Sequence, residues 1–190
     1  MTIIGCDPSV SKTGLVIRRE DGTYHSSLIK PPAKAQDPGR LYWIAATVVA
    51  ECKLSPEVEV LLVIEHPTPK GQLDPNIPLH WRLREEFGWH YMVSTLKVWP
   101  SQVNKFAAPA GISEIGASVV QQWGHCLPNE VNPDILDALA MCKLGEMFLG
   151  LCEGTKDQMS VVRFEDSKTK KNERVAMDDR ATFGICKESE

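Results

Sequence analysis

The chain has 190 residues, of which 43% are hydrophobic and 24% are charged. This composition argues against a mainly disordered or fibrous protein, and the length predicts one domain, with or without an appendage. The formal net charge of −4 provides no bulk positive field. A nucleic-acid partner would therefore require a local basic patch or bound cations.

The sequence contains no apolar run long enough for a membrane span, and its first residues lack the basic start of a secretory signal. The six cysteines are scattered, with no closely spaced pair of the kind that binds zinc. We therefore expect a cytoplasmic protein with free thiols and no association with a membrane.

The first thirty residues predict three antiparallel strands in a meander, over residues 3–6, 15–17 and 24–29, with a hairpin turn at Asp21-Gly22. Apolar residues then recur at helical spacing over residues 40–52. The near-continuous apolar run that ends at Glu65 predicts a strand in the interior of a sheet.

Further along, the pattern predicts a helix over residues 79–93, a strand over 96–99, short helices over 101–106 and 113–125, and a helix over 133–149. Asn132-Pro133 is a strong start signal for the last of these helices. The order predicts an α/β domain with a mixed sheet over residues 1–152. Residues 153–190 are expected to form an appended hairpin or tail, with strands over 159–164 and 174–177.

Four acidic residues stand out against this framework. Asp7 and Glu65 each follow an apolar strand, where functional groups gather in α/β sheets. Asp134 and Asp137 are three residues apart and share one face of the last helix. Asp134 could simply complement the helix dipole, whereas Asp137 lies within an apolar run. If the four converge, their repulsion calls for divalent cations such as Mg²⁺; otherwise they are unrelated surface acids.

Four sequence blocks stand in order along the chain: Ile4-Gly5-Cys6-Asp7-Pro8-Ser9 followed by Thr13-Gly14, Leu62-Val63-Ile64-Glu65, Trp99-Pro100-Ser101-Gln102-Val103-Asn104-Lys105, and Pro133-Asp134-Ile135-Leu136-Asp137-Ala138-Leu139-Ala140. Together, and in this order, they resemble the RuvC family of Holliday-junction resolvases, especially its phage-type members. The resemblance covers about residues 1–150.

The resemblance implies a ribonuclease H-like fold with a five-stranded sheet, a homodimer, and a structure-selective endonuclease that cuts two strands of a four-way DNA junction. Asp7, Glu65, Asp134 and Asp137 would bind two Mg²⁺ or Mn²⁺ ions per active site. Water would be the nucleophile, leaving 5′-phosphate and 3′-hydroxyl ends. The source would be a bacterium or a phage-infected host cell.

The chain also departs from the family pattern. Asn104 stands where the family has a lysine, and we expect the next residue, Lys105, to take its catalytic role, with both contacting DNA. His66-Pro67 replaces an aromatic wedge that some members carry. Further DNA contacts are expected from basic residues that could alternatively be solvated surface charges, namely Arg82, Arg84, Lys168, Lys170 and Lys171.

Other interpretations remain open from the sequence. Trp81 and Trp89 could stack on unpaired bases, although packing in the core or in a dimer interface is favoured. The departures from the family pattern leave room for a nuclease of flaps, branched DNA or RNA–DNA hybrids. An actin-like ATPase and a junction-binding protein that does not cut are less well supported by the residues present.

Overall fold

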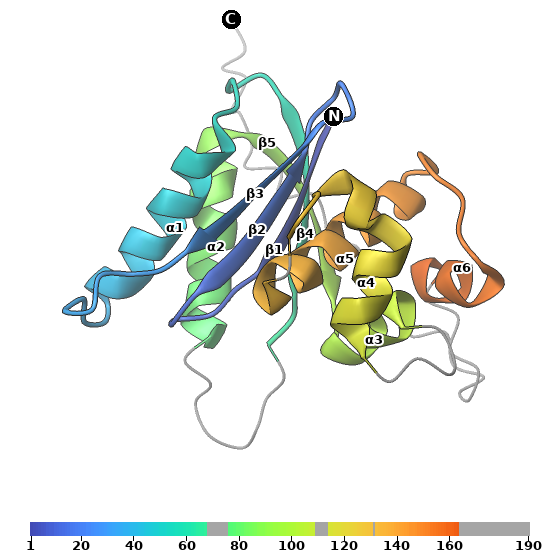
Figure 1. Ribbon diagram of the computed structural model, residues 1–190. Coiled ribbons are helices and arrows are strands. Elements are labelled where there is room, and N and C mark those ends of the chain that lie inside the picture. The colour runs from blue at the N-terminus through green and yellow to red at the C-terminus, as the bar shows by residue number, and fades with distance from the viewer. Residues whose placement is uncertain (68–75, 109–113, 131, 164–190) are drawn as a thin grey trace, which may run out of the picture.

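The computed structural model describes residues 1–67, 76–108, 114–130 and 132–163. Within these residues, five strands form one sheet in the order β3-β2-β1-β4-β5 (Figure 1). The strands are β1 (Thr2–Asp7), β2 (Thr13–Arg18), β3 (Tyr24–Ile29), β4 (Glu59–Glu65) and β5 (Met92–Val98).

The sheet is mixed, as predicted. Strands β1, β2 and β3 are antiparallel neighbours, which confirms the meander, and β4 is parallel to both β1 and β5. The apolar strand β4 therefore lies between two other strands. Buried residues cover both of its faces, so its near-continuous hydrophobic run is explained by its place in the sheet.

Helices cover both faces of the sheet (Figure 1). One face packs against α1 (Gly39–Cys52) and α2 (Asn76–His90), through a core that includes Ile4, Cys6 and Leu62. The other face packs against α5 (Pro133–Phe148), through Ile3, Leu61 and Val63. Alternate residues of each strand thus enter opposite cores, as the pleat requires. The helices on this second side are α3 (Pro100–Ala107), α4 (Ile115–Trp123), α5 and α6 (Lys156–Val162), with a short 3₁₀ turn at Gly124–Cys126.

Helix α5 approaches the sheet closely because two strand residues lack side chains. A β-carbon on Gly5 would lie 2.0 Å from the carbonyl oxygen of Ala138, and one on Gly14 would lie 2.0 Å from that of Asp134. No side chain can occupy either space, so glycine permits direct contact between helix and strand backbones. This contact sets the position of the first turns of α5.

Two predicted boundaries were wrong. Strand β5 begins at Met92, several residues before the predicted start, and α2 ends at His90. Among the described residues, strand β5 pairs only with β4, and four residues of β5 are only partly buried, so its hydrophobic alternation is weak. Helix α3 begins at Pro100, whose missing N–H costs nothing at a first helical position.

The predicted strand beginning at Met159 was also wrong, because α6 occupies that segment. The Thr155 hydroxyl accepts a hydrogen bond from the Gln158 N–H, and the Gln158 side chain accepts one from the Thr155 N–H, which forms a capping box. Gln158 also donates to the carbonyl of Phe106 on α3. The predicted strand over residues 174–177 lies outside the described residues.

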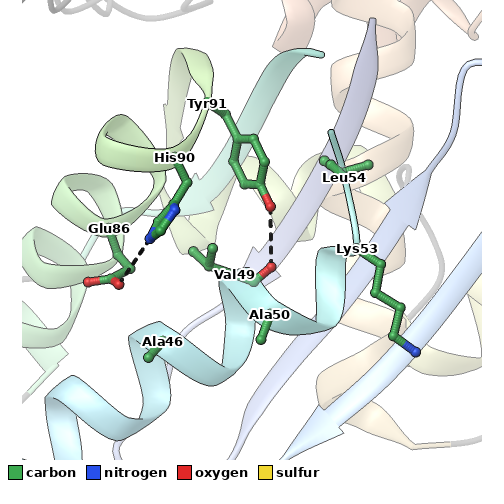
Figure 2. Close-up of a pocket in the computed structure, with 8 residues that line it drawn as sticks. All are labelled: Ala46, Val49, Ala50, Lys53, Leu54, Glu86, His90 and Tyr91. Carbon is green, nitrogen blue, oxygen red and sulfur yellow. Dashed lines mark hydrogen bonds and ion pairs between the residues drawn. The ribbon is translucent and has the colours of Figure 1, made fainter. Parts of the chain in front are cut away.

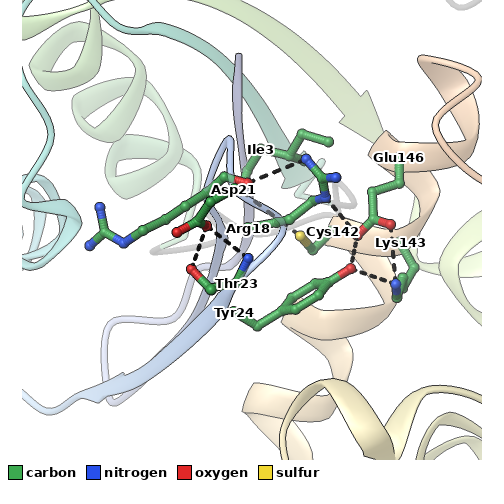
Figure 3. Close-up of polar contacts among 9 residues, drawn as sticks. Ile3, Arg18, Asp21, Thr23, Tyr24, Cys142, Lys143 and Glu146 are labelled. Carbon is green, nitrogen blue, oxygen red and sulfur yellow. Dashed lines mark hydrogen bonds and ion pairs between the residues drawn. The ribbon is translucent and has the colours of Figure 1, made fainter.

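A buried polar network joins β2 and β3 to α5 (Figure 3). The Tyr24 hydroxyl donates to Glu146, Lys143 Nζ donates to the Tyr24 hydroxyl at 2.5 Å and to Glu146 at 3.1 Å, and Arg18 Nε lies 3.8 Å from Glu146. Burial and the neighbouring Glu146 carboxylate raise the pKa of Tyr24. Each buried charge in the network has an opposite partner, as burial requires.

We expect Tyr24→Phe to lower the free energy of unfolding by about 1–2 kcal/mol, because Glu146 and Lys143 each lose a hydrogen-bond partner. Urea denaturation at neutral pH measures this, with the m-value unchanged because the fold is retained. Tyr42→Phe, at an exposed position on α1, is the matched control. Equal stability of the two variants would contradict a stabilising role for the network.

Candidate active site

Asp7 and Glu65 are brought to one edge of the sheet by strand pairing. Each is the last residue of its strand, and Cys6 of β1 pairs with Ile64 of the parallel strand β4. The two carboxylates therefore leave the sheet from adjacent positions at the carboxyl ends of neighbouring strands. Both side chains are only partly exposed.

Helix α5 adds the other two carboxylates. Gly14 pairs with Asp7 across β1 and β2 and also touches the backbone of Asp134, so the helix begins next to Asp7. Asn132 caps this helix by accepting a hydrogen bond from the Asp134 N–H at 3.1 Å. Asp137 follows three residues later, on the same face of the helix. Asp7, Glu65, Asp134 and Asp137 together form the acidic quartet.

The charges of the acidic quartet act on one another. Burial, followed by the charges of Glu65, Asp137 and Asp134, raises the pKa of Asp7 to about 7. Burial and Asp137 raise the pKa of Glu65 to about 7. Burial and Asp134 also raise the pKa of Asp137. Each of the four therefore acts on, or feels, the charge of another member of the quartet.

The chemistry of this donor set fits a hard divalent cation. All four side chains offer oxygen atoms, and two of them lie beside the positive end of a helix dipole. In the residues described, no three His, Cys, Asp or Glu side chains already form a metal-binding cluster. The quartet offers the type of oxygen ligand that Mg²⁺ or Mn²⁺ prefers, but its side chains are not arranged as a ready-made metal cluster.

A lysine that the sequence analysis did not single out belongs to this site. Lys12 Nζ lies 2.6 Å from a carboxylate oxygen of Asp134, and its charge also lowers the pKa of Asp7. Lys12 lies in the short turn between β1 and β2. Its position in that turn, directly after the first acidic block, is the signal that could have identified it.

Aromatic and histidine rings lie next to Glu65. The rings of His66 and Trp99 are 4.3 Å apart, and His80 is 5.8 Å from His66. Burial and the nearby charge of Arg84 lower the pKa of His80 to about 4, so its ring is neutral near pH 7. His66 therefore lies beside the acidic quartet as part of an aromatic cluster.

The two arginines on α2 that were predicted to contact DNA have partners within the protein. Arg82 pairs with Glu85 at 3.2 Å and Glu86 at 2.6 Å, and it stacks on Tyr42 and Trp89, so its charge is already balanced. Arg84 lies over the ring of Trp81. Their contacts with DNA stay predictions.

The side chains of Asn104 and Lys105 are exposed on α3, which starts at the same edge of the sheet as Glu65. The described structure shows no hydrogen bond or ion pair between Lys105 and the acidic quartet. The catalytic role of Lys105 therefore stays a prediction. Lys168, Lys170 and Lys171 lie outside the described residues.

Trp81 and Trp89 are not core residues, because 57% and 63% of their surfaces are exposed. Both lie on α2, as does part of a shallow groove of about 380 Å³ between α1 and α2 (Figure 2). In that groove the Tyr91 hydroxyl points toward the carbonyl of Val49, and His90 faces Glu86. None of the acidic quartet lines it.

Two solved structures have a similar architecture. The structure of RuvC from Thermus thermophilus in complex with a Holliday junction substrate matches with a TM-score of 0.57 and 15% sequence identity, covering 80% of this chain and 96% of that chain. The chain has a RuvC-like fold. A second structure of RuvC from T. thermophilus matches with a TM-score of 0.56, also at 15% identity and the same coverage.

The RuvC-like fold confirms the predicted α/β architecture, with its mixed five-stranded sheet between layers of helices. No protein-family model matches the sequence, and no curated protein matches it significantly. Among the described residues, no helix has both the length and the apolar character needed to cross a bilayer.

Proposed function

We propose that this chain is a metal-dependent, structure-selective endonuclease that resolves four-way DNA junctions. The observation that supports this most strongly is the acidic quartet, which combines two carboxylates at the carboxyl ends of β1 and β4 with two on α5, in a RuvC-like fold. The similar RuvC structure was solved with a Holliday junction substrate. The quartet supplies the kind of site that phosphodiester hydrolysis requires.

In this proposal Asp7 and Glu65, from the strands, and Asp134 and Asp137, from the helix, would hold two Mg²⁺ or Mn²⁺ ions. When bound, such ions stabilise the attacking and leaving oxygens of phosphoryl displacement. The carboxylates orient the water nucleophile and keep the site negative enough to retain the ions. The ions in turn offset the repulsion between an acidic protein and DNA.

We also propose that the protein acts as a homodimer. A four-way junction has approximate twofold symmetry, and an isologous dimer presents two equivalent sites to it. The exposed tryptophans of α2 are of the residue type that is enriched at protein interfaces. Symmetry therefore predicts paired cuts in opposite strands of the junction.

The test is cleavage, with Mg²⁺, of four substrates of matched sequence: a four-way junction, a flap, an RNA–DNA hybrid and a linear duplex. We expect the junction to be cut at least about tenfold faster than the others, because only it offers two sites of matching symmetry. The two cuts should be symmetric and should carry 5′-phosphate ends. Preferential cleavage of the hybrid or flap would reassign the substrate, and no cleavage of any would overturn the nuclease proposal.

A further inference from the structure

Lys12 places a positive charge directly on the acidic quartet. Its ammonium group is 2.6 Å from Asp134, whose side chain is only 18% exposed, while 45% of the Lys12 side chain is exposed. The same charge opposes the repulsion felt by Asp7. The lysine thus acts on one carboxylate from α5 and on another from β1.

The position of Lys12 is built into the fold. Thr13 Oγ1 donates to the carbonyl of Ser9 at 3.0 Å and accepts from the Ser9 N–H at 3.3 Å, which closes the turn that carries Lys12. Two residues after Lys12, Gly14 meets the backbone of Asp134 directly. The turn and the start of α5 are therefore held side by side, and a long cationic side chain at position 12 reaches the first carboxylate of the helix.

We propose that Lys12 is a resident counter-ion of the acidic quartet, which occupies part of the cation-binding region until a divalent ion displaces it. This inference rests on the proposed function, because it assumes that the quartet binds Mg²⁺. Two cations beside the same carboxylates repel one another, so a bound ion and the lysine compete. Lys12 therefore stabilises the metal-free protein and weakens its affinity for metal.

Lys12→Met removes the charge while keeping most of the apolar length of the side chain. In the metal-free variant the quartet loses its counter-charge, so at pH 8 we expect a melting temperature lower by about 2–4 °C. We expect the Mg²⁺ concentration that gives half of the metal-induced thermal shift to fall by roughly three- to tenfold, because the competing charge is gone. Thermal melting of DNA-free protein, titrated with MgCl₂ at constant ionic strength, measures both effects.

Two variants serve as controls, and a third repeats the neutralisation. Lys12→Arg keeps the charge and should stay within about twofold of the wild-type Mg²⁺ dependence, because the counter-ion remains. Lys53→Met removes a lysine that directly follows α1, near the start of β4. Because this is the opposite end of the strands from the quartet, the Mg²⁺ dependence should stay unchanged. Lys12→Gln repeats the neutralisation with a polar side chain, should Lys12→Met fold poorly.

The outcomes separate this inference from the proposed function. An unchanged or weaker affinity for Mg²⁺ in both neutral variants would overturn the counter-ion role, even if wild-type protein binds Mg²⁺ and Glu65→Gln does not. If Mg²⁺ does not stabilise the wild-type protein at all, or stabilises Glu65→Gln equally well, the metal site itself fails. A gain in affinity shared by Lys12→Arg would show that the charge is not responsible and would also overturn the inference.

Discussion

Replacing Asp7, Glu65 or Asp137 by the matching amide, as in Asp7→Asn, Glu65→Gln and Asp137→Asn, is expected to lower the rate of junction cleavage by at least about a thousandfold. An amide carries no negative charge and has one acceptor oxygen where a carboxylate has two. Each variant should therefore hold divalent ions poorly. Single-turnover cleavage of a synthetic four-way junction, with saturating enzyme and Mg²⁺, measures the loss.

Glu59→Gln is the matched control, because Glu59 is exposed at the opposite end of the strand that carries Glu65. It makes the same chemical change on the same element, and cleavage should stay within about twofold of wild type. Junction binding measured without metal should survive in all of these variants. Normal cleavage by any of the three quartet variants would remove that residue from the active site.

The stability of the metal-free protein should depend on pH in a way that reveals the quartet. The pKa values of Asp7 and Glu65 are raised from 3.8 and 4.5 to about 7. Between about pH 4 and pH 7 the folded protein therefore holds protons on these groups that the unfolded chain has released. The free energy of unfolding therefore falls as pH rises through that window. Above pH 7 the loss of stability caused by these two groups is complete and stays constant.

His80 has the opposite effect on the pH dependence of stability. Its pKa is lowered to about 4, so the unfolded chain binds the proton more readily and the contribution of His80 to stability rises with pH. A comparison of variant with wild type cancels that contribution. We expect Asp7→Asn to raise the free energy of unfolding by about 1–3 kcal/mol at pH 8, and by less than half of that at pH 5, because pH 5 lies only part of the way through the window. Urea denaturation in EDTA at the two pH values measures the difference.

Addition of Mg²⁺ at pH 8 should stabilise wild-type protein and leave Asp7→Asn nearly unaffected, because ligand binding to the folded state adds to its stability. A destabilising effect of Asp7→Asn at pH 8 without metal would contradict the burial and repulsion that together raise the pKa of Asp7. An equal effect at pH 5 and pH 8 would show that it does not come from charge.

Much of the site follows from residue order alone. Asp7 and Glu65 come directly after apolar runs, and neighbouring parallel strands bring such ends to one edge. The start of α5 could also be predicted, because Asn132 and Pro133 are strong local signals for a helix start. These features depend on short-range pattern, and for that reason they could be predicted.

The features that could not be predicted depend on distant partners. The contact between Lys12 and Asp134 joins residues more than a hundred positions apart, and so does the pairing of Tyr24 with Glu146. Strand β5 takes its register from β4, not from its own weak alternation. Helix α6 depends on a capping box and on packing against α3, which the local hydrophobic pattern did not distinguish from a strand.

The two glycines under α5 have a consequence for how precisely the four carboxylates are placed. The backbone of α5 lies directly on the strand backbone at Gly5 and Gly14. The distance between the strand carboxylates and the helix carboxylates is therefore set by backbone contact, with no flexible side chain between them that could adjust. Even a single methyl group there would push the helix outward and carry two of the four acids with it. The placement of the four carboxylates is therefore sensitive to substitution at two positions that contribute no side chain to the candidate site.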